Sequence, residues 1–99
     1  MSFEVRFTEE AADDLERLYA HLVVKHPSAA TDAFKAIEKG WRFLELFPFS
    51  CRKVSSSNPF LREIIIPFGS RGYVALFEIE NNETVTVLAI RHQLEQDYH

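Results

Sequence analysis

Two runs of alternating residues near the C-terminus constrain the fold more than any other feature of this sequence. Residues 72–80 (GYVALFEIE) and 84–91 (TVTVLAIR) place apolar side chains at nearly every second position, which is the period of a β-strand. Between them lie Asn81, Asn82 and Glu83, and asparagine tolerates the positive φ of a tight turn. The pattern predicts an antiparallel β-hairpin, the strongest local signal in the chain.

A short strand and a helix are predicted at the N-terminus. Residues 3–7 alternate between apolar and polar, and Thr8 is then placed to cap a helix over residues 9–25. Pro27 ends this helix, because the residue before a proline avoids helical geometry. We expect the buried stripe of the helix to contain Ala12, Leu15, Tyr19, Leu22 and Val23.

A second helix is predicted to begin with Ser28 as its cap and to end at Pro48. One face carries Ala30, Ala33, Phe34, Ile37, Trp41 and Leu44. A second stripe at the same spacing carries Ala36, Gly40, Phe43 and Phe47. A helix that is apolar on two sides is wedged between two elements or has one side covered by a partner.

A loop and three strands complete the predicted domain. Residues 49–59 are rich in serine and other turn formers, so we expect an exposed loop, and residues 60–66 are β-branched and apolar, which predicts a strand. The order β-α-α-β-β-β indicates the α+β class, with a helical hairpin packed on a mostly antiparallel sheet. Because 99 residues are too few for a second core, we expect a single domain over residues 1–99.

Charge and cysteine content exclude several classes of protein. Fifteen acidic and eleven basic residues give a net charge of -4, which is unfavourable for gripping a phosphate backbone, so we do not expect direct nucleic-acid binding. The segment from Arg52 to Arg71 is nonetheless basic, which indicates either ordinary surface charge or a surface for an acidic partner. With one cysteine, no signal peptide and no apolar run of membrane-spanning length, we expect a soluble cytoplasmic protein without membrane contact.

The sequence contains no recognisable catalytic or metal-binding motif. His21 and His26 are five residues apart, which puts them on different helix faces, and no cysteine or carboxylate completes a ligand set. Nucleophile motifs, glycine-rich phosphate loops and paired carboxylates are also absent, so we expect no metal and no organic cofactor. His92, which follows Arg91 at the end of the last strand, is the histidine best placed for a catalytic or contact role.

Arg62 lies in an apolar strand and therefore needs a hydrogen-bond acceptor. Strand alternation places it on the same face as Ile64 and Ile66, so that its side chain is partly buried. We expect the acceptor to be a carboxylate such as Glu95 or Asp97, or a backbone carbonyl. The resulting hypothesis is that Arg62 ties the C-terminal tail to the sheet.

Short motifs spread over nearly the whole chain have the order and spacing of a known protein family. They are Val5-x-Phe7-Thr8-x-x-Ala11-x-x-Asp14-Leu15, Ala29-Ala30, Leu46-x-x-x-x-Cys51-Arg52, Leu61-Arg62-Glu63, Gly72-Tyr73-x-x-x-Phe77-Glu78-Ile79, Val87-Leu88-Ala89-Ile90-Arg91-His92 and Glu95-x-Asp97-Tyr98. In this order they resemble the RelE/ParE superfamily of small bacterial toxins from type II toxin–antitoxin modules. Cys51 stands where that family has glycine.

The resemblance implies two competing functions. RelE-type ribonucleases cut messenger RNA on the ribosome with basic side chains on the sheet, including an arginine directly after the Gly-Tyr pair, where this chain has Val74. Their preceding strand carries lysine, whereas this chain has Ile65, Ile66 and Pro67. ParE-type toxins lack the basic set and act by binding DNA gyrase rather than by catalysis. The resemblance therefore favours a ParE-like gyrase inhibitor, as in plasmid stabilisation systems, without catalytic residues.

Two other interpretations stay open at this point. A RelE-type endoribonuclease would need a different arrangement of side chains, for which the sequence offers Arg62, Arg71, His92 and Tyr98. An inactive relative would survive as a partner-binding module, and sequence alone does not separate it from a non-catalytic toxin.

The resemblance also implies a cognate antitoxin as partner, with DNA gyrase as the second candidate. Because the second helix has more apolar surface than one sheet-facing stripe requires, we expect a C-terminal segment of the antitoxin to cover Phe43, Phe47 or Phe49, by adding a strand or a helix. Arg91 and His92 are the remaining candidate contacts with a partner.

Overall fold

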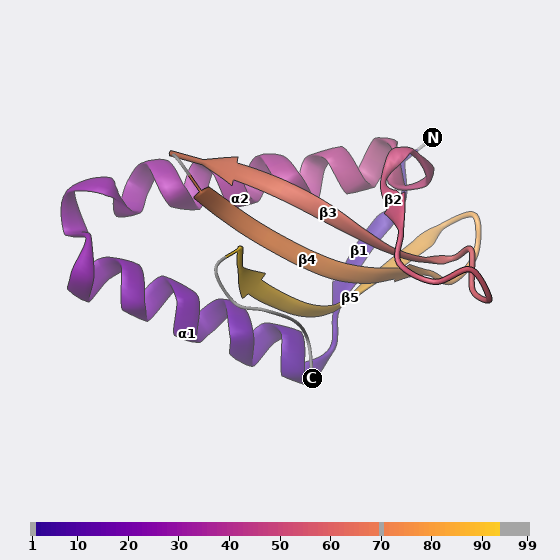
Figure 1. Ribbon diagram of the computed structural model, residues 1–99, viewed down its shortest axis with the longest axis horizontal. Helices are drawn as coiled ribbons and strands as arrows, with labels where there is room; N and C mark the ends of the chain where they lie inside the picture. Colours follow the sequence, from indigo (N-terminus) through magenta and orange to yellow (C-terminus); the bar gives the residue numbers. More distant parts are fainter. Residues whose placement is uncertain (1, 70, 94–99) are drawn as a thin grey trace.

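A computed structural model of the chain shows two helices on one face of a five-stranded sheet, and it describes residues 2–69 and 71–93 without the side chain of Arg71 (Figure 1). The sheet order is β1-β5-β4-β3-β2; β1 is parallel to β5, and the other neighbours are antiparallel. The predicted α+β class is thus confirmed. The elements are β1 (Glu4–Phe7), α1 (Glu9–Lys25), α2 (Pro27–Leu46), the 3₁₀ turn η1 (Pro48–Ser50), β2 (Arg52–Lys53), β3 (Leu61–Phe68), β4 (Arg71–Ile79) and β5 (Thr84–His92).

Helix α1 has the predicted bounds and the predicted cap. The Oγ of Thr8 accepts the Ala11 N–H at 3.1 Å, which satisfies one of the free donors of the first turn. The predicted buried stripe is confirmed for Leu15, Tyr19 and Leu22 and wrong for Ala12 and Val23, which are exposed. The stripe that faces β5 and α2 also contains Ala11, Asp14 and Leu18, which the pattern did not predict.

Helix α2 begins at Pro27, so the predicted cap by Ser28 is wrong. Proline is favoured in the first turn because the N–H that it lacks has no partner there, and no side chain caps this helix. Its first predicted stripe is confirmed as core. Only part of the second stripe is buried. Gly40 packs so closely on β3 that a Cβ atom there would lie 2.8 Å from the Cδ1 of Ile66. Phe43 and Phe47 are exposed.

The segment predicted as a loop contains two short elements, η1 and β2. β2 pairs with the beginning of β3, with Arg52 opposite Glu63, and was missed because two residues carry no periodicity. β3 starts one residue later than predicted and continues through Pro67, which is compatible with a sheet edge.

The predicted hairpin between β4 and β5 is confirmed, but its turn does not use positive φ. The Glu80 N–H donates to the Thr84 carbonyl at 2.9 Å, which closes the hairpin. No non-glycine residue among those described has a positive φ. Instead, the Oδ1 of Asn81 accepts the Glu83 N–H at 2.7 Å, so the asparagine side chain shapes the turn.

The core lies between the sheet and the two helices. Its largest fully buried side chains include Phe77, Val85 and Val87 from the sheet and Ile37 and Leu44 from α2. No helix within the described ranges is long and apolar enough to cross a bilayer.

Candidate partner-binding surface

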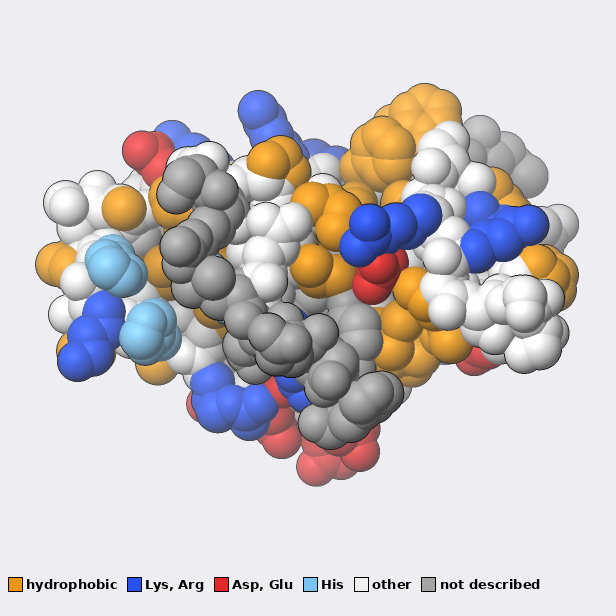
Figure 2. All heavy atoms as spheres, in the orientation of Figure 1, with side chains coloured by type: hydrophobic (Ala, Val, Ile, Leu, Met, Phe, Trp, Pro, Cys, Tyr) orange, Lys and Arg blue, Asp and Glu red, His pale blue; other side chains and the backbone are white. Residues whose placement is uncertain are grey.

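Exposed phenylalanines gather where α2 ends and the chain turns into η1 (Figure 2). The rings of Phe43 and Phe47 lie 5.5 Å apart between centroids, and Phe49 packs edge to face with Phe60 at 6.4 Å. Between 41% and 53% of each residue is exposed. We call these four residues the aromatic cluster. Exposed apolar surface of this kind marks interaction sites in soluble proteins.

Arg62 holds the backbone that carries part of this cluster. Its Nε donates to the Pro59 carbonyl at 2.7 Å, and its Nη1 donates to the carbonyls of Phe49 and Cys51, each at 2.9 Å. The guanidinium also lies 5.4 Å from the centre of the Phe49 ring. Arg62 is 8% exposed, so the carbonyls compensate a charge that is removed from water.

The expected acceptor for Arg62 is confirmed in its carbonyl form, whereas the hypothesis that Arg62 ties the C-terminal tail to the sheet concerns residues outside the described ranges. The described acceptors belong to residues 49–59, because that segment folds back beside the start of β3. Glu95 and Asp97 lie outside the described residues. The role that the structure gives Arg62 is therefore to fix the segment that carries Phe49.

A groove of about 510 Å³ runs between α2 and β3 and reaches the aromatic cluster at Phe43. We call it the α2–β3 groove. Its floor is apolar, since Gly40 exposes no side chain and the isoleucines of β3 lie below it. Basic side chains stand along the α2 edge of the molecule in Figure 2. The residues that line the groove are Asp32, Lys35, Ala36, Lys39, Gly40, Phe43, Ile64, Ile65, Ile66 and Pro67.

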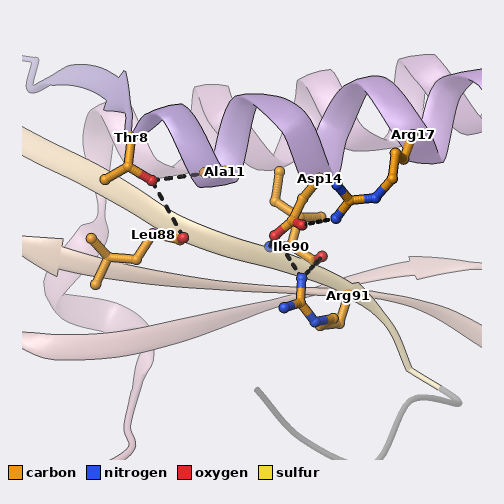
Figure 3. A network of polar contacts seen from close by, with 7 residues as sticks. All are labelled: Thr8, Ala11, Asp14, Arg17, Leu88, Ile90 and Arg91. Atoms are coloured by element: carbon orange, nitrogen blue, oxygen red, sulfur yellow. Dashed lines mark hydrogen bonds and ion pairs between the residues drawn. The ribbon is translucent and has the colours of Figure 1, made fainter. Parts of the chain in front are cut away.

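A second polar site, which the sequence analysis missed, joins α1 to the end of β5 (Figure 3). The Oδ2 of Asp14 accepts the backbone N–H of Ile90 at 3.1 Å and the Nη1 of Arg91 at 2.6 Å, and its Oδ1 accepts from Arg17. A signal was available in the sequence. Asp14 lies three residues after Ala11 and one before Leu15, on the stripe that the helix buries, where a carboxylate needs partners.

Arg91 and His92 line a hollow of about 510 Å³ beside this network, together with Arg17 and His21. The His92 ring packs edge to face on Tyr73 at 5.5 Å, and burial raises the pKa of the Tyr73 hydroxyl. His21 does not point away from His26 as expected, because His26 lies beyond the last turn of α1 and the two rings approach to 6.1 Å. Within the described residues no group of histidine, cysteine or carboxylate side chains could hold a metal ion.

The structure separates the candidate nuclease residues. Arg62 pairs with Phe77, whereas His92 pairs with Tyr73, so the two residues are two strands apart and about 13 Å apart along the strands. The backbone of Arg71 lies at the same end of the sheet as His92. Its side chain and Tyr98 lie outside what the structure describes.

The two predicted groups of partner contacts also lie apart. Phe49 and Phe60 of the aromatic cluster lie beside the turn between β4 and β5, where they share a hollow with Ile79 and Asn81. Arg91 and His92 occupy the opposite end of β5. They form two surfaces rather than one.

Comparisons with known proteins agree with the fold and identify a family. Residues 5–97 match the family described as "ParE toxin of type II toxin-antitoxin system, parDE". The chain is 35% identical over 96 residues to "Toxin RelE1" of Caulobacter vibrioides (strain ATCC 19089 / CIP 103742 / CB 15), which covers 97% of this chain and 99% of that protein. A chain of the solved structure "Chromosomal ParDE TA system from P. aeruginosa" shares the fold, with a TM-score of 0.69 and 23% identity over 91% of this chain and 95% of that one.

Proposed function

We propose that this chain, which belongs to the ParE toxin family of type II toxin–antitoxin systems, arrests growth in the cytoplasm by binding DNA gyrase rather than by cutting RNA. The observation that carries the proposal is the state of Arg62. This arginine is buried and donates to backbone carbonyls, so its guanidinium serves the fold. Ribonuclease chemistry needs cations that face the transferring phosphate.

The face of the sheet that the helices leave uncovered supports the same conclusion. Ile65 and Val74 stand opposite each other there, at positions where RelE-type nucleases carry basic side chains. Arg91 lies opposite Val74, and its Nη1 forms an ion pair with the Asp14 carboxylate, which offsets the positive charge of the guanidinium. An apolar pair beside a neutralised arginine is a poor environment for charge that develops on a phosphate, and it suits contact with a protein.

Two assays on the purified chain test the mechanism. We expect the chain to inhibit DNA supercoiling by purified gyrase and to leave messenger RNA intact on translating ribosomes. Cleaved messenger RNA together with unaffected gyrase would contradict the proposal and favour the nuclease. Expression without growth arrest would contradict both and favour an inactive relative.

We place the antitoxin on the aromatic cluster. Family membership implies an antitoxin partner. The cluster is an exposed apolar surface, and covering it with a partner is energetically favourable. Large, partly exposed aromatic side chains supply much of the binding energy in such interfaces. A C-terminal segment of the antitoxin, in helical or extended form, would bury Phe43, Phe47 and Phe49.

A substitution in the cluster tests this placement. Phe47→Ala should weaken binding to the cognate antitoxin by about ten- to a hundredfold in a calorimetric titration. Val24→Ala is the matched control, because Val24 is an exposed apolar residue near the end of α1, away from the cluster. If both variants and the unchanged chain bound the antitoxin with equal affinity, the proposed position of the antitoxin on the cluster would be contradicted.

A further inference from the structure

The carboxylate of Asp14 has more cationic partners than the fold requires. Its side chain is 7% exposed, and its Oδ2 accepts the Ile90 N–H at 3.1 Å and the Nη1 of Arg91 at 2.6 Å. One cation is enough to balance one buried carboxylate. The guanidinium of Arg17 reaches the other carboxylate oxygen from α1 (Figure 3). These three side chains, which we call the Arg17–Asp14–Arg91 cluster, together carry one positive charge in excess.

The excess charge lies at the surface, on Arg17. Its side chain is 71% exposed, whereas that of Arg91 is 27% exposed. Among the described residues, Arg17 forms an ion pair with Asp14 alone. That contact uses only its Nη2, and a guanidinium has five N–H groups. Arg17 can therefore donate to a second carboxylate without leaving the first.

A hollow of about 510 Å³ opens beside Arg17, between α1 and the end of β5. Leu18 and Ile90 give it an apolar wall, and His21 lies one turn after Arg17 on the same side of α1. A hollow with an apolar wall and a few polar groups at its rim is typical of a binding site. Its chemistry suits an anionic group next to an apolar one.

Carboxylates beside the cluster decide which class of anion fits. A second hollow, of about 440 Å³, is lined by Glu10 and Asp13 together with Arg17 and Arg91. The phosphates of a nucleic acid are closely spaced, so those next to a phosphate bound at Arg17 would meet these carboxylates. The net charge of -4 opposes a polyanion in the same way. A peptide, in contrast, can present one carboxylate and continue with neutral side chains.

We propose that Arg17 binds an acidic side chain of DNA gyrase, which makes the surface between α1 and the end of β5 the contact of this toxin with its target. This inference rests on the gyrase binding proposed above and gives it a place on the molecule. The carboxylate of the partner pairs with the outer N–H groups of Arg17, and an apolar side chain beside it packs against Leu18. Asp14 is a positioning residue, because it holds Arg17 at the rim of the hollow.

The proposed contact lies apart from part of the surface that we assign to the antitoxin. Phe49 and Phe60 of the aromatic cluster lie beside the turn between β4 and β5, whereas the hollow beside Arg17 lies at the other end of β5. A substitution of Arg17 should therefore weaken the binding of gyrase and leave the binding of the antitoxin unchanged.

A titration of the free chain with short peptides tests the chemistry of the site without gyrase. A blocked tripeptide of glutamate, alanine and leucine should shift the Arg17 Nε–H resonance in NMR spectra, and the same peptide with glutamine in place of glutamate should not. The Nε–H of Arg6 is the internal control, because Arg6 is also exposed and ion-paired but lines neither hollow. Equal shifts with both peptides would overturn the site. A larger shift with a six-nucleotide oligothymidylate would overturn the acidic peptide and favour nucleic acid.

Arg17→Gln tests the contact in the complex with purified gyrase. The affinity should fall by about five- to tenfold, mainly through slower association, and should become less sensitive to salt, because an exposed charge steers the encounter. Arg6→Gln is the matched control and should change the affinity less than twofold. The melting temperature of Arg17→Gln should stay unchanged, because Asp14 keeps Arg91 and the Ile90 N–H as partners.

The outcomes separate this inference from the proposed function. Equal gyrase affinities of Arg17→Gln and Arg6→Gln would overturn the contact surface and leave gyrase binding intact. An equal loss of affinity of Arg17→Gln for the antitoxin would also overturn it, because the site would then not be specific for the target. Failure of the unchanged chain to bind gyrase would contradict the proposed function itself.

Discussion

The carboxylate of Asp14 accepts the backbone N–H of Ile90 at 3.1 Å, where β5 has passed the end of its neighbour β1. β1 pairs with β5 only as far as Val87. Beyond that residue, side chains of α1 and of its cap form hydrogen bonds with the backbone of β5. The Oγ of Thr8 donates to the Leu88 carbonyl, and the Asp14 carboxylate accepts the Ile90 N–H farther along the same edge. The helix thereby completes an edge that the short first strand leaves open.

Asp14→Ala should lower the free energy of unfolding by about 2–4 kcal/mol, because it leaves the Ile90 N–H and the Arg91 guanidinium without their shared acceptor. Urea denaturation followed by circular dichroism measures this loss. Asp13→Ala is the matched control, since Asp13 is exposed on the same turn, and it should stay within about 0.5 kcal/mol. Similar losses in both variants would contradict the structural role of Asp14.

Arg62→Met should also destabilise the fold, by about 2–4 kcal/mol, because the carbonyls of Phe49, Cys51 and Pro59 lose their donor. Hydrogen exchange should increase most between residues 49 and 59. Arg52→Met removes an arginine, 62% exposed, from its ion pair with Glu63 and should cost less than about 1 kcal/mol. A uniform increase in exchange over the sheet would argue against a local anchor.

The thiol of Cys51 should be unreactive in the folded chain. Burial raises its pKa from 9.0 to about 11, although the nearby Arg62 acts in the opposite direction. At pH 8 the thiolate fraction is then about a hundredth of that in the unfolded chain, so alkylation by iodoacetamide should slow by at least about 100-fold. Mass spectrometry of native and urea-unfolded samples gives both rates, and equal rates would refute the burial.

The raised pKa of Cys51 also determines how its contribution to the stability of the fold changes with pH. Between pH 9 and 11 the unfolded thiol loses its proton while the folded one keeps it. The folded state then binds more protons, so the contribution of Cys51 to stability should fall as the pH rises through this window. Cys51→Ser should show a weaker fall over the same range in parallel urea titrations, and an identical pH dependence of both proteins would exclude the thiol as its source.

Gly40 and Ile66 should be energetically coupled. A Cβ atom at Gly40 would meet the Cδ1 of Ile66 at 2.8 Å, and we expect this overlap to exceed the roughly 1 kcal/mol that alanine gains in a helix. Ile66→Val removes that atom, although it keeps the Cγ1 that would lie at 2.9 Å, and it should therefore cost at least about 0.5 kcal/mol less in the Gly40→Ala background than in the original chain. Ile64→Val is the control, because the Ile64 Cδ1 would lie at 4.0 Å, and it should be additive.

The sequence was most informative where a signal is local. Thr8 capped the predicted helix, and the alternation of residues 72–80 and 84–91 gave the hairpin, because caps and strand periods depend on neighbours in the chain. Ser28 was predicted to cap α2, whereas the helix begins at Pro27, because serine is common at a cap and proline in the first turn and only packing decides between the two positions. A two-residue strand such as β2 exists through its contacts with β3 and carries no pattern of its own.

The candidate site was less predictable because its contacts join distant parts of the chain. The exposed stripe that includes Phe43 and Phe47 was visible as surplus apolar surface on a helix. The role of Asp14 was not, because its acceptor function depends on a backbone amide 76 residues away. Arg62 was recognised as needing an acceptor, yet the identity of that acceptor depends on how residues 49–59 fold back.

His92→Gln should leave growth arrest intact, and this substitution separates a binding toxin from a nuclease. A general acid or base contributes about 10²–10⁴ to a reaction rate, so a nuclease that used His92 would lose its toxicity. Arg62, the arginine that would have to act beside it, is buried two strands away. His21→Gln on α1 is the matched control for the same change of side chain. Growth curves after induction, at protein levels equalised by immunoblot, give the result. Complete loss of arrest in His92→Gln alone, with an unchanged melting temperature, would count against gyrase binding as the mechanism.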